Sequence, residues 1–196
     1  MSKLTAIAVF CGSSPSNDDT IFRAAYGVGK HLATHKLDIV FGGSKLGLMG
    51  QVAQGALDAG GNVIGVIPEF LRTKEVVHNY LTELIITDSM QERKLKMHEL
   101  SDGIITLPGG FGTFEELFEM LTWAQLGLHK KPIGILNTNG YYDDLLVMLK
   151  TMVNKELLSK ENFELLLVDS DLDQLIKKME NFTPLPVPEW MNKDQA

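Results

Sequence analysis

Cysteine and basic charge are both scarce in this sequence, and each shortage narrows what the protein can be. The 196 residues include one cysteine, Cys11, so no intramolecular disulfide can form. Because Cys11 ends an apolar run, we expect its thiol to be buried as core filler. The 18 basic residues are outnumbered by 25 acidic ones, and the formal charge is -7. This balance lacks the basic surface that attracts nucleic acids or anionic lipids.

Long apolar runs and targeting signals are missing as well. No stretch approaches the roughly 20 apolar residues of a membrane span. The N-terminal MSKLTAIAVFCGSS has no basic region followed by a cleavage pattern. A reducing compartment fits the single cysteine, so we expect a cytoplasmic protein without membrane or nucleic-acid partners.

Two familiar chemical signatures are also missing. Of the five histidines, only His31 and His35 share helical spacing, with no third ligand near them, so we expect no metal site. The loop GGFGTF lacks the lysine of the G-x-x-x-x-G-K-[ST] phosphate loop, and no G-x-G-x-x-G follows the first apolar run. A phosphate site here would have to use a different loop.

What the sequence does have is an alternation of short β-rich runs with segments of helical periodicity, which is typical of a parallel sheet covered by helices on both faces. The 44% hydrophobic content suits one core, so we predict a single α/β domain over residues 1–182 and a proline-rich tail over 183–196. The expected strands are 5–12, 38–43, 62–68, 82–88, 103–109, 131–137 and 164–169. The first expected helix begins at Asn17 or Asp18 and ends at His35. Further helices are expected over 47–59, 90–100, 113–126 and 141–158, and a last helix begins near Asp171.

Glycine-rich turns follow three of the expected strands: CGSS the first, GGSKLGLMG the second and PGGFGT the fifth. In open parallel sheets, ligands bind beyond the carboxyl ends of the strands, where glycine lets the backbone approach an anion and the next helix offers free N–H groups. One such turn is usually only a tight connection, but three at one edge predict a nucleotide or sugar-phosphate site. The turns contribute the candidate residues Ser13, Ser14, Gly42, Gly43 and Gly109.

The segment MQERKLKM, residues 90–97, places two cations on the same helical face as two methionines. A half-buried arginine needs an anionic partner, so we expect Arg93 to contact a carboxylate, a phosphate or both. A purely structural ion pair is the alternative for both Arg93 and Lys94. Lys94 could instead extend its long stem into water.

The segment TFEE, residues 113–116, has two interpretations. T-x-x-E is a capping box, in which Thr113 and Glu116 satisfy N–H groups of the first helical turn. Three preceding glycines are not needed for a cap, whereas they do bring backbone N–H groups against an oxyanion with an acid beside it. Thr113 could serve the phosphate and the cap together.

These motifs resemble those of a known family. PGGFGTFEE matches P-G-G-x-G-T-x-x-E, MQERK matches M-x-x-R-K, and GGSKLGLMG is similar to the glycine turn of the Lonely-guy (LOG) family of cytokinin riboside 5'-monophosphate phosphoribohydrolases. The likeness extends to about residue 160. It implies a Rossmann-like fold, a dimer, and cofactor-free hydrolysis of the N-glycosidic bond of a nucleoside 5'-monophosphate to free base and ribose 5-phosphate.

Carried over by position, the resemblance implies that Arg93 and Glu116 are catalytic. The residues that would line the substrate site are Glu75, Lys94, Gly110, Phe111, Gly112, Thr113, Phe114, Glu115 and Thr122. Bond cleavage builds positive charge on the ribose, which the Glu116 carboxylate would stabilise while it orients or deprotonates water. The 5'-phosphate would rest on the N–H groups of residues 110–113. Arg93 would fix the substrate or Glu116, or relieve charge on the departing base; the sequence leaves these roles open, and it leaves the identity of the base open too.

Two rival function classes remain. A lysine decarboxylase would need a lysine that forms a Schiff base with pyridoxal phosphate, and Lys45 is the only candidate. A non-catalytic nucleotide or cofactor carrier of Rossmann-like fold is the stronger rival, although a carrier gains nothing from a carboxylate beside the phosphate. Apolar residues on several faces of 113–128, among them Phe118, Leu121 and Trp123, predict a homodimer interface, unless this helix simply lies in the core.

Overall fold

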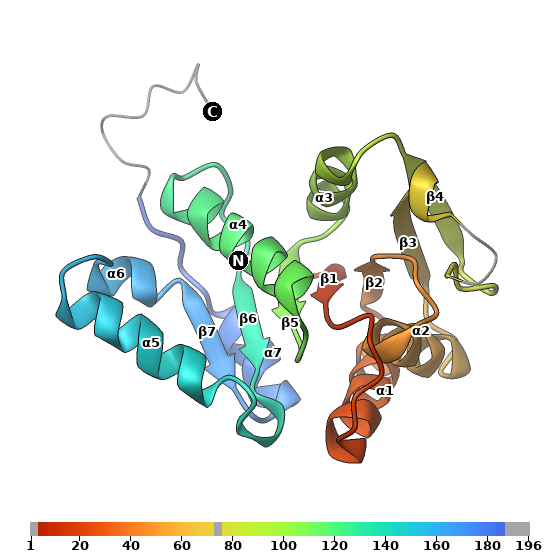
Figure 1. Ribbon diagram of the computed structural model, residues 1–196, viewed down its shortest axis with the longest axis horizontal. Helices are drawn as coiled ribbons and strands as arrows, with labels where there is room; N and C mark the ends of the chain where they lie inside the picture. Colours follow the sequence, from red (N-terminus) through yellow and green to blue (C-terminus); the bar gives the residue numbers. More distant parts are fainter. Residues whose placement is uncertain (1–3, 73–75, 187–196) are drawn as a thin grey trace.

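A computed structural model describes residues 4–72 and 76–186, and its architecture confirms the predicted α/β fold (Figure 1). Seven parallel strands form one sheet in the order β4-β3-β2-β1-β5-β6-β7. The strands are β1 Ala6–Phe10, β2 Asp38–Phe41, β3 Val63–Pro68, β4 Glu83–Thr87, β5 Gly103–Thr106, β6 Ile133–Leu136 and β7 Leu166–Asp169. The inner strands are apolar without alternation because helices cover both of their faces.

Helices form a layer on each face of the sheet. The helices are α1 Asp19–Thr34, α2 Gly47–Asp58, α3 Met90–Glu99, α4 Phe111–Gln125, α5 Asp143–Asn154, α6 Lys160–Phe163 and α7 Leu172–Glu180, with short 3-10 turns η1 Glu69–Leu71 and η2 Thr138–Gly140. Buried side chains of α1, α2 and α7 share one hydrophobic core with the sheet. Those of α3, α4 and α5 share a second core on the opposite face.

Several helix ends follow the expected signals. Asp18 caps α1 by accepting from the N–H of Thr20 at 2.8 Å, and Asp171 caps α7 by accepting from the N–H of Gln174 at 2.9 Å. Two predicted boundaries are wrong at α5, which spans Asp143–Asn154 and not 141–158. The helix ends at Asn154 because Glu156, two residues further on, has a φ of 58°, which cannot continue a helix. The short helix α6 was not predicted.

The predicted capping box at the start of α4 is wrong. The helix begins at Phe111, with Gly110 as its N-cap and no side-chain cap, so Thr113 and Glu116 lie inside the helix. A box of this kind occurs at α3 instead: the Ser89 hydroxyl accepts from the N–H of Glu92 at 3.1 Å, and the Glu92 carboxylate accepts from the N–H of Asp88 at 2.8 Å. Glu116 is therefore free for another role.

The chain order creates a crevice at the centre of the sheet. From β1 the chain builds outward through β2 and β3 to β4, and then returns to place β5 on the other side of β1. The helices that follow β1 and β5 consequently lie on opposite faces, which opens the carboxyl edge between them. Hydrogen bonds tie the three glycine turns together there: Gly12 N–H donates to Pro108 O at 3.0 Å, and Leu48 N–H donates to Gly12 O at 2.9 Å.

Two further sequence-based predictions concern the cellular location and the C-terminal tail. Within residues 4–72 and 76–186, no helix has the length and apolarity that crossing a membrane requires. The cytoplasmic location stays a prediction. Residues 183–186 follow α7 without regular structure, and the rest of the expected proline-rich tail lies outside the described residues, so the boundary at residue 182 also stays a prediction.

Candidate active site

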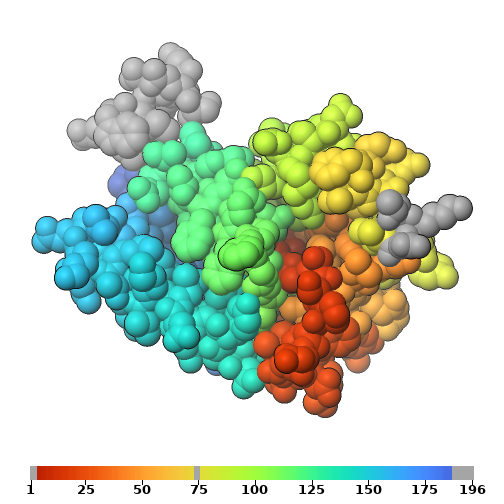
Figure 2. Space-filling view, viewed as in Figure 1, coloured from red at the N-terminus to blue at the C-terminus, as the bar shows by residue number. Residues whose placement is uncertain are grey.

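A cavity of about 500 Å³ lies at the carboxyl edge of the sheet, between the turn after β1 and the start of α4. Figure 2 shows these two segments, red and green, side by side on the front of the molecule. Ten of the candidates from the sequence line this cavity: Ser13, Ser14, Arg93, Gly109, Gly110, Phe111, Gly112, Thr113, Glu115 and Glu116. Three segments that are distant in the sequence therefore meet at one hollow.

The first turn of α4 forms one wall of the cavity. The first intrahelical bond runs from Phe114 N–H to Gly110 O at 3.1 Å, so the N–H groups of residues 111–113 precede the helical ladder. The buried Thr113 side chain packs over Gly109, where a Cβ would lie 2.1 Å from the Thr113 hydroxyl oxygen. The glycine is needed for this close approach. The result is a helix N-terminus that presents N–H groups and a positive dipole end to the cavity.

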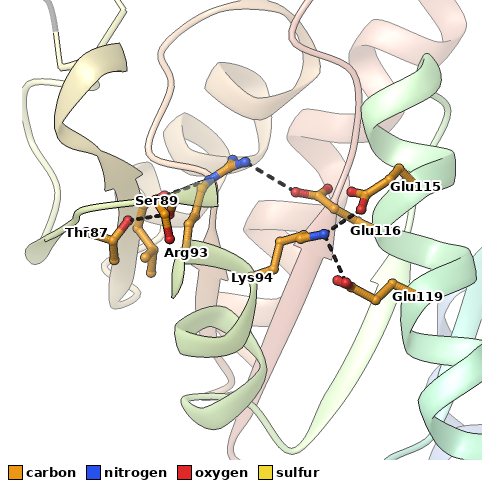
Figure 3. Close-up of polar contacts among 8 residues, drawn as sticks. Thr87, Ser89, Arg93, Lys94, Glu115, Glu116 and Glu119 are labelled. Atoms are coloured by element: carbon orange, nitrogen blue, oxygen red, sulfur yellow. Dashed lines mark hydrogen bonds and ion pairs between the residues drawn. The ribbon is translucent and has the colours of Figure 1, made fainter. Parts of the chain in front are cut away.

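Arg93 and Glu116 form a buried ion pair at the cavity wall (Figure 3). Arg93 Nη1 donates to Glu116 Oε1 at 3.3 Å, and Arg93 Nε donates to Val66 O at 3.0 Å. The side chains are only 10% and 11% exposed. The arginine is thus anchored on the sheet and oriented toward the carboxylate, as its position on the methionine face of α3 predicted.

The surroundings of Glu116 disfavour its ionised form. Burial raises the pKa of the Glu116 carboxyl above its usual 4.5, with a further contribution from nearby Glu115, while Arg93 opposes the shift.

The expected burial of Cys11 is confirmed, and its thiol also lines the cavity. Burial, and then the proximity of Glu116, raise the pKa of Cys11, which keeps this thiol protonated and unreactive at neutral pH.

Lys94 lies beside the ion pair but contacts different carboxylates. Figure 3 shows its ammonium group between Glu115 and Glu119 of α4, to both of which it donates hydrogen bonds. Burial disfavours the ammonium ion, but these two partners outweigh it and raise the pKa of Lys94. The expectation that this side chain could extend into water is wrong, since it is 11% exposed.

Two glycines of the turn after β2 leave the space that neighbouring parts of the site occupy. At Gly42 a Cβ would lie 1.9 Å from Arg93 Nη2, so only glycine leaves room for the guanidinium. At Gly47 the φ is 54° and a Cβ would lie 2.5 Å from the Ser13 backbone. The N–H groups that open α2 are directed at Gly12 O, at 2.9 Å from Leu48 N and 3.4 Å from Met49 N. This turn therefore shapes the site, and its helix N-terminus is engaged by protein.

The remaining candidates lie elsewhere. Gly42, Gly43, Lys94 and Phe114 do not line the cavity, and Phe114 packs into the core against Tyr142. Thr122 lines a separate hollow between α4, α5 and α6. Glu75 lies outside the described residues. Lys45, the candidate for a Schiff base, is exposed and does not line the cavity.

Tyr141 is a lining residue that sequence reasoning did not single out. It follows η2, and its hydroxyl donates to Gly109 O at 2.7 Å across the mouth of the cavity. The adjacent Tyr142 is buried and donates to Leu107 O at 2.7 Å. The signal was present as the doublet in NGYYDD after the sixth strand, at the same sheet edge as the three glycine turns.

The histidine pair differs from its sequence-based description. His31 and His35 were expected to have no third ligand near them, but Asp173 of α7 places a carboxylate oxygen 3.2 Å from His31 Nε2. A contact across 138 or more residues cannot be inferred from local spacing, because it depends on how α7 packs beside α1. None of the three lines the cavity.

Comparison with known proteins identifies close relatives. A family described as "Possible lysine decarboxylase" matches residues 49–179. A probable cytokinin riboside 5'-monophosphate phosphoribohydrolase of Oryza sativa subsp. japonica is 42% identical over 94% of this chain and 81% of its own length. A cytokinin riboside 5'-monophosphate phosphoribohydrolase of Arabidopsis thaliana is 41% identical over 93% of this chain and 85% of its own length.

Solved structures share the fold at lower identity. The molybdenum cofactor binding protein of Rippkaea orientalis has a TM-score of 0.69 at 21% identity, covering 92% of this chain and 98% of the other. The molybdenum cofactor carrier protein of Chlamydomonas reinhardtii has a TM-score of 0.66 at 22% identity, covering 91% of this chain and 98% of the other. These likenesses concern the fold alone. The curated relatives match at 41–42% identity over more than nine-tenths of the chain, and this chain therefore belongs to the Lonely-guy (LOG) family of cytokinin riboside 5'-monophosphate phosphoribohydrolases.

Proposed function

We propose that the protein hydrolyses the N-glycosidic bond of a nucleoside 5'-monophosphate, either AMP or an N6-modified cytokinin riboside monophosphate, and releases the free base and ribose 5-phosphate. The observation that carries this proposal is the buried Arg93–Glu116 pair at a cavity that is also lined by the N-terminus of α4. The curated relatives bear the name of this activity.

Each part of the cavity has a role in this reaction. The 5'-phosphate binds the N–H groups at the start of α4, with Ser13 and Ser14 facing it from the turn after β1. This places the ribose beside Glu116, whose carboxylate stabilises the positive charge that develops as the bond to the base breaks. The oxygen of a water molecule bonds to the anomeric carbon as the bond from this carbon to the base breaks, and a proton of the water passes to Glu116. The departing base takes the bonding electron pair and gains a proton from solvent, and Glu116 returns its proton to solvent.

The geometry favours one of the three roles considered for Arg93. Its guanidinium is fixed by Val66 O and by Glu116, so it orients the carboxylate and limits its protonation. A carboxyl with a raised pKa is a better base than an ordinary glutamate, while the arginine keeps it ionised enough to act. Arg93 is thus proposed to position Glu116.

The two rival functions have less support. A lysine decarboxylase would need a lysine at the cavity, whereas Lys45 is exposed and outside its lining. In a carrier, the ionised Glu116 would repel a bound phosphate, and this cost would not be offset by any role in catalysis. The structural likeness to molybdenum cofactor carriers concerns the fold, which hosts many functions.

The test is to incubate the purified protein with AMP, an N6-prenylated AMP and the two unphosphorylated nucleosides, and to measure free base and ribose 5-phosphate. We expect release of free base from the monophosphates, with and without a chelator. Little base should be released from the nucleosides, because they have no phosphate to bind the N-terminus of α4. The ratio of the two monophosphate rates identifies the preferred base. Tight nucleotide binding without release of base would support the carrier.

We also propose a homodimer formed through α4 and the apolar hollow beside it. This helix buries Leu117 and Met120 in the core, while Phe118 and Leu121, which are only partly buried, border a mostly apolar hollow of about 210 Å³ between α4, α5 and α6. Apolar surface on both sides of one helix is typical of an interface. Light scattering at micromolar concentration should give twice the mass of the chain. Gln125→Arg, an exposed position lining the hollow, should yield a folded monomer, and a monomeric wild type would refute the proposal.

A further inference from the structure

His31, His35 and Asp173 form a compact cluster at the surface, away from the cavity. The two histidine rings of α1 stack with centroids 4.1 Å apart and planes inclined by 25°. Asp173, in the first turn of α7, places Oδ1 3.2 Å from His31 Nε2. One ligand atom from each residue lies within 4.8 Å of the other two. Two imidazoles and a carboxylate thus converge from two helices.

The core of the protein fixes this convergence. Histidines four residues apart project from the same face of a helix. On α1 the neighbouring Leu32 is fully buried, and on α7 so is Leu175; both belong to the same hydrophobic core. The two helices are therefore held beside each other by packing beneath the cluster, whereas the three side chains above are at least partly exposed and can adjust.

Each imidazole has a partner close to one of its ring nitrogens. Burial lowers the pKa of His31, and neighbouring His35 lowers it further, against the opposing effect of Asp173. The Asp173 carboxylate lies 3.2 Å from His31 Nε2, and a metal ion would take the place of the proton between them. His35 Nδ1 lies 2.9 Å from His31 O. If Nδ1 carries the proton of this hydrogen bond, Nε2 keeps its lone pair for a ligand.

We propose that His31, His35 and Asp173 bind a divalent transition-metal ion, with Zn²⁺ as the preferred occupant, and that the ion links α1 to α7. Zn²⁺ takes nitrogen ligands at about 2.0–2.1 Å and carboxylate oxygens at about 2.0–2.2 Å, so tetrahedral ligands stand roughly 3.4 Å apart. The separations here extend from 3.2 Å to at most 4.8 Å, which small side-chain rotations can close. Water completes the coordination. The nitrogen ligands favour zinc over Mg²⁺ or Ca²⁺, which prefer oxygen.

The site would act on stability and not on chemistry. It lies outside the cavity lining, so the ion supplies nothing to the hydrolysis proposed above. A metal ion that binds the folded chain stabilises it by mass action, because the unfolded chain does not hold the two helices together. The proposal is thus independent of the enzymatic activity and has a separate readout.

Titration calorimetry with ZnCl₂, on chelator-treated and desalted protein, tests the proposal. We expect one saturable site per chain and a rise in Tm on adding zinc. His35→Ala and Asp173→Asn should each weaken zinc binding at least about tenfold, and His31→Ala/His35→Ala should abolish the rise in Tm. Asp144→Asn is the matched control, because it removes an exposed first-turn acid from α5 and should leave zinc binding unchanged.

Two results would overturn the proposal. Zinc binding by wild type that is no tighter than binding by the double histidine variant would place the ion elsewhere. Equal affinities for wild type and Asp173→Asn would reduce the site to a histidine pair on one helix, with no link to α7. Because Asp173 is 61% exposed and asparagine has nearly the same shape, this variant should fold, and its Tm without metal verifies that it does.

Discussion

Glu116→Gln separates the chemical role of this residue from a structural one. The side chain is 11% exposed, lies inside α4, and accepts from Arg93 Nη1 at 3.3 Å. A glutamine has the same shape, and its carbonyl oxygen can still accept this bond. The loss of charge assistance costs about 1–2 kcal/mol. Removing a carboxylate whose burial is unfavourable offsets part of this, so we expect a net destabilisation of about 1 kcal/mol or less.

The size of the stability change should depend on pH. Because burial raises the folded-state pKa of Glu116 above that of the unfolded chain, its ionisation destabilises the native state as the pH rises through that folded-state value. The glutamine does not ionise. The stability of the variant relative to wild type should therefore improve toward neutral pH, and thermal unfolding at several pH values measures this.

Turnover should respond far more strongly than stability. An amide offers neither a negative charge to the developing cation nor a base for water, so we expect the rate of base release to fall about 10²- to 10⁴-fold. This corresponds to about 3–5 kcal/mol of transition-state stabilisation. Binding of ribose 5-phosphate should survive, since its proposed phosphate site is the start of α4 and does not include the Glu116 carboxylate. The assay is base release from saturating AMP, with product binding by calorimetry.

Glu92→Gln provides the matched control. Glu92 completes the box that caps α3, where a glutamine works as well, so both stability and turnover should stay close to wild type. Turnover of Glu116→Gln close to that of wild type would refute the mechanism. The carboxylate would then act only as the partner of Arg93, and hydrolysis would need another base or have to be abandoned for the carrier function.

The other predictions concern the groups around that carboxylate. Gly42→Ala should lower kcat about 100-fold by displacing the Arg93 guanidinium, while Gly27→Ala, where a Cβ meets open space, should not; equal rates would refute the need for glycine. Tyr141→Phe loses the hydrogen bond to Gly109 O and should raise the KM for AMP about two- to tenfold with little change in kcat; an unchanged KM would contradict this. The pH–rate profile should fall on the acid side with an apparent pKa above 4.5, and this limb should move to higher pH in the residual activity of Arg93→Ala, which lacks the group that lowers that pKa.

Most of the fold could be predicted because its signals are local. Seven apolar runs bounded by turn residues gave seven strands, and Asp18 and Asp171 marked helix starts through a side chain that bonds two or three residues ahead. The start of α4 was misplaced for a related reason. T-x-x-E matches a capping box locally, but the packing of Thr113 over Gly109 draws the helix start back to Phe111.

The site was only partly predictable because its contacts join distant segments. The position of Arg93 on its helix predicted that its side chain would contact an anion. Its hydrogen bond to Val66 O could not be predicted in this way, because it depends on the position of β3 in the sheet. Tyr141 and Asp173 were missed for the same reason. Each lies more than 30 residues from its partner, and nothing near it in the sequence reveals that partner.

The glycine turns, alike in sequence, serve different physical purposes. The turn after β5 places the N–H groups that open α4 at the cavity, where we propose that the phosphate binds. The turn after β2 directs the corresponding N–H groups of α2 at Gly12 O and uses Gly42 to admit a guanidinium. That guanidinium opposes the unfavourable burial of Glu116. In the proposed site a phosphate binds close to an acid, and the cation that pairs with this acid limits their repulsion. The second turn supplies the space for that cation.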